Sequence, residues 1–170
     1  MAESAKIIVV VPTYNERENL PVLAALLSDL KLPGLQMLVV DDNSPDGTGD
    51  VADELAKAAP TEVSVLHRTE KDGLGRAYIA GISRALDENA DIVIADITGE
   101  NPNVMYELGY AQRADKPTVI LNQRVEASSF DLRDWRQVPY SPSPTNAEQA
   151  DLSRHLVDAI RMAETRAASG

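Results

Sequence analysis

Residues 90–111, ADIVIADITGENPNVMYELGYA, combine an apolar run, a polar corner and a helical pattern. The apolar run at 91–96 (DIVIAD) is short and rich in Ile and Val, which is typical of a buried strand in a parallel sheet. After the corner, Asn101 can cap a helix whose first position suits Pro102. The stretch therefore predicts a strand that ends at Asp96 and a helix that begins near Asn101, which is the repeating unit of parallel α/β folds.

Three polar side chains share one face of this predicted helix, because Asn103, Glu107 and Tyr110 fall at helical spacing. Asp96 stands at the carboxyl end of the strand, the edge where open α/β sheets bind their ligands. The two carboxylates, Asp96 and Glu107, are therefore candidate site residues. Spacing alone also permits a solvated helix position for Glu107 and a turn-forming role for Asp96.

Apolar runs and amphipathic segments alternate along the rest of the chain. Five main strands are expected, at residues 6–12, 36–40, 63–67, 91–96 and 118–121. Helices are expected at residues 20–30, 48–59, 78–86, 101–111 and 147–167, and a short edge strand is one option at residues 137–140. This alternation predicts a single α/β domain over residues 1–170. We expect a Rossmann-like three-layer sandwich whose mainly parallel sheet has the order 3-2-1-4-5, with helices on both faces.

The composition excludes several classes of function. With 27 acidic and 16 basic residues the net charge is −11, which disfavours nucleic acid and anionic membrane surfaces as partners. There is no cysteine, so disulfides and thiolate chemistry are excluded, and two histidines far apart in sequence do not suggest a metal site. The start MAESAK leads directly into a strand-like run, which predicts a cytoplasmic protein without a signal peptide or spanning segment. A homo-oligomer is left open.

The run ADIVIADITGENPNVMYELGYAQRADKPTVIL resembles the nucleoside 2-deoxyribosyltransferase-like superfamily, which includes nucleotide N-glycosidases and TIR-like nucleotide-binding domains. The shared motif is an acid at a strand end, a variable loop, and a helix that carries YELG. The resemblance covers residues 87–170. It implies that Glu107 acts at an anomeric carbon, with Asp96 as acid or ribose contact and no cofactor. Contacts to the base, sugar or phosphate are expected from Asn101, Asn103 and Tyr110.

Three motifs in the first half of the chain point elsewhere: VPTYNE at 11–16, VVDDNSPDGT at 39–48 and KDGLGRA at 71–77. Together they resemble family 2 glycosyltransferases, and in particular the polyprenol (dolichol) phosphate mannosyltransferase group. In that family the PTYNE loop and the aspartates after the second strand hold the nucleotide of a sugar donor. The resemblance implies nucleotide-binding roles that are shared by Pro12, Tyr14, Glu16 and Asp42.

The same resemblance implies a divalent metal. The fourth strand of that family ends in an Asp-Ala-Asp metal site, where this chain has Ile94-Ala95-Asp96. Asp96 is therefore the candidate ligand for Mg or Mn in this alternative. The acid-rich turn that contains Asp41, Asp42 and Asp46 is either a second Mg²⁺ candidate or an Asx-rich turn without metal.

The two resemblances meet near Asp87, so the sequence reads as a chimera of residues 1–86 and 87–170, natural or engineered. Three functions follow. The first is a nucleotide- or nucleoside-binding domain that cleaves or transfers an N-glycosidic bond with Glu107 as the key carboxylate. The second is the nucleotide-sugar-binding half of a metal-dependent family 2 glycosyltransferase. The third is a designed chimera with no catalytic activity.

Overall fold

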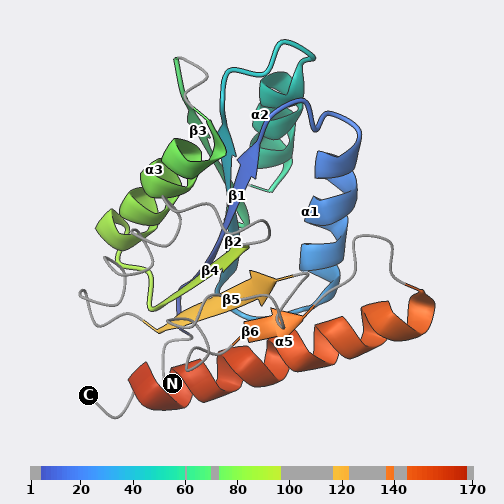
Figure 1. Ribbon diagram of the computed structural model, residues 1–170, viewed down its shortest axis with the longest axis vertical. Helices are drawn as coiled ribbons and strands as arrows, with labels where there is room; N and C mark the ends of the chain where they lie inside the picture. The colour runs from blue at the N-terminus through green and yellow to red at the C-terminus, as the bar shows by residue number, and fades with distance from the viewer. Residues whose placement is uncertain are drawn as a thin grey trace.

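The computed structural model describes residues 5–59, 61–69, 73–96, 117–122, 137–139 and 145–167 (Figure 1). In these residues six strands form one parallel sheet with the order β3-β2-β1-β4-β5-β6. The strands are β1 (Ile7–Thr13), β2 (Leu35–Asp41), β3 (Val63–His67), β4 (Ile92–Asp96), β5 (Thr118–Asn122) and β6 (Gln137–Pro139). The helices are α1 (Asn19–Asp29), α2 (Thr48–Ala58), α3 (Leu74–Asp87) and α5 (Asn146–Ala167).

The predicted fold class and the strand order 3-2-1-4-5 are confirmed, with one addition. The optional edge strand is present as β6, so the sheet has six strands where five main ones were expected. The helix expected at residues 101–111 lies outside the described residues. Strands from both halves of the predicted chimera lie in the same sheet, because β4 pairs with β1 in the register Ile7↔Ile92.

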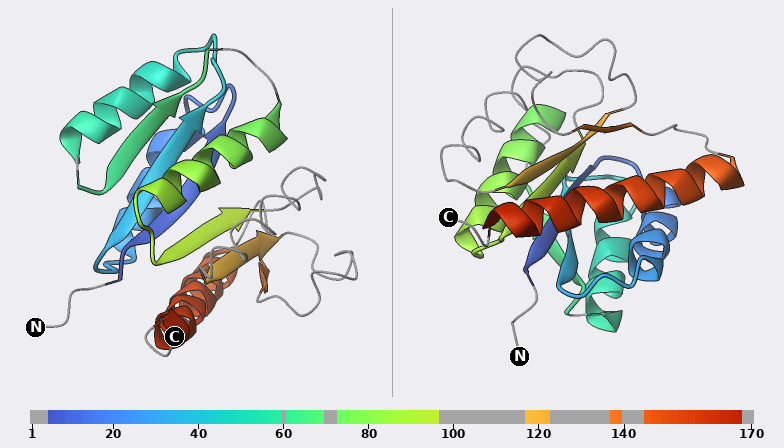
Figure 2. Two further views of the ribbon diagram at one scale, coloured as in Figure 1. Left: turned by 90° about the vertical axis from the view of Figure 1, so that its left-hand side faces the viewer. Right: turned by 90° about the horizontal axis from the view of Figure 1, so that it is seen from below.

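Helices cover the sheet on both faces (Figure 2). Successive side chains of a strand point to opposite faces. In β1, Ile8 and Val10 join the core under α3, whereas Ile7 and Val9 join the core under α5 and the end of α1. A third cluster packs α1 and α2 against β2 and β3 on the same face as α5. Because the strands are buried on both faces, apolar residues occupy successive positions along them and do not alternate with polar ones.

The strand order places a ligand-binding position at the centre of the sheet. Because the strands are parallel, their carboxyl ends share one edge. The chain adds β2 and β3 on one side of β1 and then crosses to β4 on the other side. Such a reversal leaves the carboxyl ends of β1 and β4 as the point where open α/β sheets bind ligands. Thr13 and Asp96 are the last residues of these two strands.

Close contact between α3 and the sheet depends on Gly81. A Cβ atom at this position would lie 2.3 Å from Val10 Cγ1 and 2.9 Å from Val40 Cγ2. Both valines are buried in the sheet, at 3% and 0% exposure, so neither can move aside freely.

We expect Gly81→Ala to lower the free energy of unfolding by about 1–3 kcal/mol, because overpacking outweighs the better helix propensity of alanine. Urea denaturation measures the change. Val10→Ala removes the nearest methyl groups, so Gly81→Ala should cost less in that background. Equal costs in both backgrounds would contradict the steric explanation.

Candidate functional site

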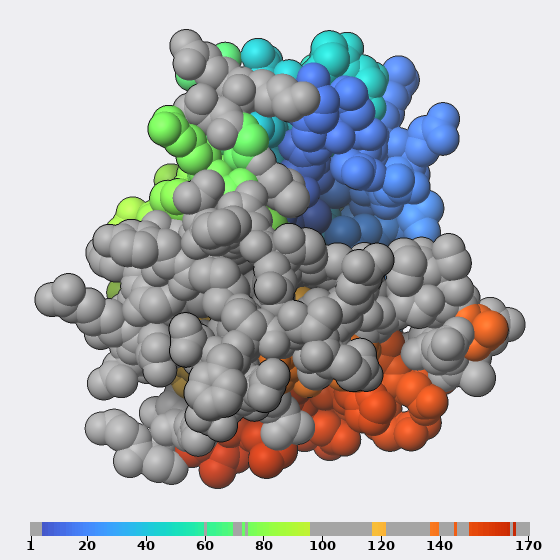
Figure 3. Space-filling view, in the orientation of Figure 1, coloured from blue at the N-terminus to red at the C-terminus, as the bar shows by residue number. Residues whose placement is uncertain are grey.

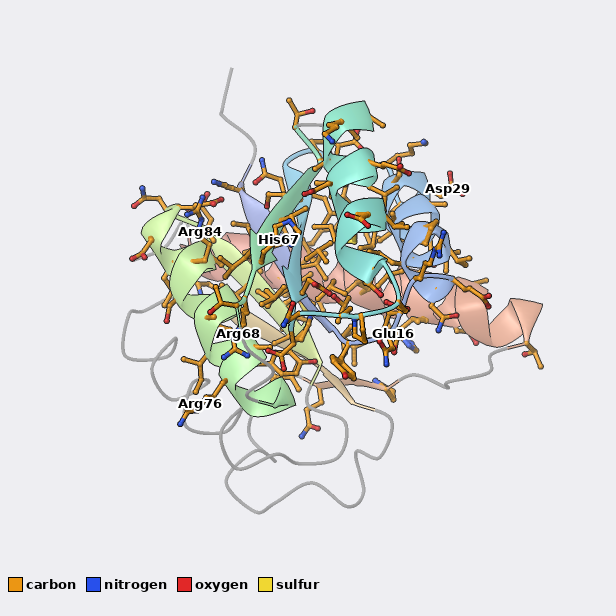
Figure 4. All side chains as sticks on the ribbon, turned by 90° about the horizontal axis from the view of Figure 1, so that it is seen from above. Glu16, Asp29, His67, Arg68, Arg76 and Arg84 are labelled. Carbon is orange, nitrogen blue, oxygen red and sulfur yellow. The ribbon has the colours of Figure 1, made fainter. Side chains whose placement is uncertain are left out.

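Three loops meet at the carboxyl edge of the sheet. They follow β1 (residues 14–18), β2 (residues 42–47) and β3 (residues 68–73, of which 70–72 are outside the description). In Figure 3 the blue, cyan and green segments of this edge lie next to one another at the top of the molecule. Figure 4 looks down on this edge, with Glu16 on one side and Arg68 and Arg76 on the other. The three motifs of the first half of the chain are therefore neighbours in space.

Asp41, the last residue of β2, connects the first two loops. Its carboxylate accepts hydrogen bonds from Thr13 Oγ1 (3.4 Å), Ser44 Oγ (2.5 Å) and Ser44 N (3.2 Å). The backbone N–H of Asp42 donates to the carbonyl of Thr13 (3.0 Å). The bonds from Ser44 close a local turn after β2, and together with Thr13 they satisfy a carboxylate that is only 3% exposed.

Asp42 connects the second loop to the third. Its Oδ1 accepts from Arg68 Nη1, and its Oδ2 accepts from the backbone N–H of Gly73 at 3.2 Å. The side chains of Asp42 and Arg68 are 5% and 16% exposed. The cation and the N–H donor offset the cost of burying this carboxylate, which would be several kcal/mol without partners.

Asp46 and Thr48 fix the loop after β1 to the start of α2. Thr48 Oγ1 donates to Asp46 Oδ1 (2.6 Å) and accepts from the backbone N–H of Glu16 (2.9 Å). The backbone N–H of Arg17 donates to Asp46 Oδ2 (3.2 Å). The hydrogen bond from Thr48 lowers the pKa of the Asp46 carboxyl, helped by those from the backbone of Thr48 and Arg17. Gly47, at φ 88°, supplies the left-handed backbone that this turn needs.

The predicted nucleotide contacts lie together on two adjacent loops. Pro12 and Tyr14 stand at the carboxyl end of β1 and are partly buried, and Asp42 follows β2 directly. Glu16 is also partly buried, and its Oε2 accepts from Asn19 Nδ2 at 2.7 Å. Nucleotide binding by these four residues stays a prediction.

The other predicted site residues are only partly described. Asp96 is the last residue of β4, beside β1, and its side chain is outside the description. Glu107, Asn101, Asn103 and Tyr110 lie outside the described residues, so the arrangement of the Glu107 site stays a prediction.

Arg68 and Thr48 are among the residues of this network that sequence reasoning missed. Arg68 is the first residue after β3, a position that could have marked it, but its partner Asp42 stands 26 residues earlier. Thr48 begins α2, and its contact with Glu16 spans 32 residues. Contacts at such separations leave no periodic signal in one sequence.

The described residues contain no cluster of three Asp, Glu, His or Cys side chains that could hold an ion. Ile94, at the place of the first aspartate of the family motif, is fully buried on the α5 face. Asp41, Asp42 and Asp46 each accept hydrogen bonds from their own donors, so the acid-rich turn fits the Asx-rich alternative. Asp96 stays the one predicted ligand.

Comparison with known proteins agrees with the three-loop site. Residues 8–102 match the family model of glycosyl transferase family 2. The match runs from β1 through β4 and includes all three loops. The chain belongs to this family. The match also crosses Asp87, where the sequence had suggested a junction between two proteins.

The most informative relatives are bacterial. Polyprenol monophosphomannose synthase of Mycolicibacterium smegmatis is 40% identical over 136 residues, which are 79% of this chain and 51% of the relative. Undecaprenyl-phosphate mannosyltransferase of Micrococcus luteus is 51% identical over 89 residues, which are 52% of this chain and 36% of the relative. Among solved structures, mannosyltransferase PcManGT from Pyrobaculum calidifontis in complex with GDP-Man and Mn²⁺ is 27% identical, covering 48% of this chain and 25% of that chain, with a TM-score of 0.37.

The chain spans about half the length, or less, of the curated relatives it matches. A match over 79% of the chain cannot be confined to residues 1–86, so the family 2 resemblance extends past the predicted junction. These matches support the family 2 prediction and give no support to the deoxyribosyltransferase-like one. No helix in the described part of the chain has the length and apolar character to cross a bilayer.

Thr48→Val tests the turn at Asp46. A lowered pKa means that the Asp46 carboxylate stabilises the fold above its ordinary pKa of 3.8 and loses that contribution as the pH falls through the lower folded-state value. In the variant this pKa should rise toward 3.8. The part of the stability difference between the variant and the unchanged protein that comes from Asp46 should therefore vanish at low pH, where the carboxyl is protonated in both proteins. Carboxyl NMR titration measures the pKa, with Thr61→Val on the exposed surface as control. An unchanged pKa of Asp46 would contradict the assignment.

Arg68→Ala tests the buried ion pair. We expect a loss of about 3 kcal/mol in the free energy of unfolding, because Asp42 is left buried without its cation. Arg84→Ala is the matched control, since Arg84 pairs with Glu88 at 2.6 Å but is 56% exposed, and its loss should stay below about 1 kcal/mol. Urea denaturation compares the two variants, and similar losses would argue against a special role for Arg68.

Proposed function

We propose that this chain binds the nucleotide of a sugar donor at the carboxyl edge of its sheet, as the donor-binding half of a glycosyltransferase of the polyprenol-phosphate mannosyltransferase group. The observation that carries the proposal is the meeting of the three motif-bearing loops, held by Asp41, Asp42 and Thr48. The names of the relatives from Mycolicibacterium smegmatis and Micrococcus luteus support a mannosyl donor. Transfer of the sugar to a polyprenol phosphate is part of the same proposal.

The residues of the two loops offer the chemistry that a nucleotide requires. Tyr14 provides an aromatic ring for stacking and a hydroxyl group for hydrogen bonding. Glu16 and Asp42 provide carboxylate oxygens that accept from base N–H groups or ribose hydroxyls. Although Asp42 already accepts from Arg68 and Gly73, each carboxylate oxygen has two lone pairs, so the residue keeps capacity for a ligand. Pro12, the last residue but one of β1, fixes the backbone just before the loop begins.

The proposal includes a divalent ion, Mg or Mn, for which Asp96 is the one predicted protein ligand. When bound, such an ion would neutralise charge on the diphosphate of the donor. Ile94 stands where the family motif has its first aspartate, so one of the two carboxylates of the motif is missing, and we expect a weaker dependence on metal than the intact motif would give.

A second candidate function rests on the YELG motif at residues 106–109. In it, Glu107 attacks or stabilises an anomeric carbon, Asp96 assists, and Asn101, Asn103 and Tyr110 contact the nucleoside. No metal is needed. This candidate predicts ligands of another class, namely deoxynucleosides and their monophosphates.

Isothermal titration with GDP-mannose, a UDP-sugar and a deoxynucleoside monophosphate, each with and without Mn²⁺, separates the candidates. We expect GDP-mannose to bind, and Tyr14→Ala and Glu16→Gln to weaken it at least tenfold, because each removes a proposed contact worth about 1.4 kcal/mol or more. Glu18→Gln, two residues along and exposed, is the control, and Glu107→Ala should bind normally.

Two other results would overturn this proposal. Binding of the deoxynucleotide alone, lost in Glu107→Ala, would establish the second candidate. A folded protein that binds none of these ligands would favour a catalytically silent chain.

A further inference from the structure

The helices α1 and α5 are neighbours (Figures 1 and 2), and residues of both helices line a groove. It has a volume of about 640 Å³, and its walls include Leu26 and Leu30 from α1 and Val157 from α5. Both helices pack on the same face of the sheet, where Leu30 and Leu156 join one core cluster. The groove lies away from the three loops of the carboxyl edge.

Large apolar side chains gather on these two helices. In the described residues the exposed ones are Val22 (59%), Leu26 (42%) and Met162 (56%), and all of them belong to α1 or α5. Val22 and Leu26 are four residues apart, so they project from the same side of α1. An apolar helix face beside a groove is a common arrangement at protein interfaces.

The charges at the groove are balanced on an otherwise acidic chain. Two carboxylates, Asp29 and Asp158, and two guanidinium groups, Arg154 and Arg161, line it. Within the chain Arg154 pairs with Asp151 and Asp29 with Lys31, but all four of these side chains are more than half exposed, and such pairs exchange partners at little cost. The whole chain carries a net charge of −11, so two copies repel one another at most orientations. At this groove they can meet with opposite charges facing, because each copy presents both signs.

We propose that a second copy of this chain covers the α1–α5 face, with α1 of each copy lying in the groove of the other. Val22 and Leu26 of one copy fill the apolar part of the groove, and Asp29 faces Arg154 and Arg161 of the partner. A two-fold axis repeats every contact, as a self-complementary patch requires. The proposal is independent of the nucleotide site.

Sedimentation equilibrium of the full chain, from about 1 to about 100 µM, tests the proposal. We expect a monomer–dimer equilibrium that Leu26→Asp weakens at least about thirtyfold, because the change buries a charge at the centre of the interface. Ala58→Asp is the control, since it adds the same charge at an exposed position of α2, which is neither in the groove nor on the α1 face that carries Val22, Leu26 and Asp29. Thermal melts confirm that both variants fold.

Charge reversal provides an independent test. Asp29→Arg alone, and Arg154→Asp with Arg161→Asp in another chain, should each lose self-association. An equimolar mixture should form a heterodimer, because all facing charges are then opposite. A monomer at every concentration, a dimer that Leu26→Asp leaves intact, or a mixture that stays monomeric would overturn the proposal.

Discussion

The candidate site depends on two adjacent buried carboxylates, Asp41 and Asp42, at the end of β2. Asp41 accepts hydrogen bonds from Thr13 and Ser44, and Asp42 accepts from Arg68 and Gly73. A carboxylate can be buried only when its oxygens are paired, and no buried side-chain N or O atom in the described residues lacks a partner. The three loops therefore hold one another: displacing any of them leaves a charge or a polar group unpaired in a low-dielectric environment.

The sheet beneath the loops explains why these carboxylates can meet their partners. β1, β2 and β3 are adjacent and parallel, with Thr13 opposite Asp41 and Asp41 opposite His67 in the strand register. Each loop therefore begins at the same level. The chain crosses from β3 to β4 through α3, which covers the face of the sheet opposite to α1, α2 and α5. Gly81 permits the close approach of α3 to Val10 and Val40. The position of the site follows from strand order and register before any side chain at the edge is considered.

The sequence was sufficient for the elements and their order, because β-branched runs and helical spacing are local signals. The third strand coincides with β3, and the last helix, expected at residues 147–167, is present as α5 (Asn146–Ala167). Function was harder to predict. The short YELG motif led to Glu107 as the first choice, yet the family 2 match favours the loops after β1 and β2. A short helical motif does not specify what stands opposite it, whereas three motifs in register constrain a whole edge. The pairing of Asp42 with Arg68 was out of reach because it depends on tertiary contact alone.

Helix α1 contributes to both the nucleotide site and the proposed dimer interface, but it does so with different residues. Its first turn is continuous with the loop after β1, since the N–H of Leu20 donates to the carbonyl of Glu16 at 2.9 Å. Leu26 follows six residues later, about 9 Å along the helix axis, because an α-helix rises about 1.5 Å per residue. Leu20 is 1% exposed and anchors the first turn in the core, whereas Leu26 is 42% exposed. A change at Leu26 therefore alters the outer face of α1 without touching the anchor that positions Glu16 and Tyr14. Binding at the edge and association through the helices have independent structural bases, although one helix contributes to each.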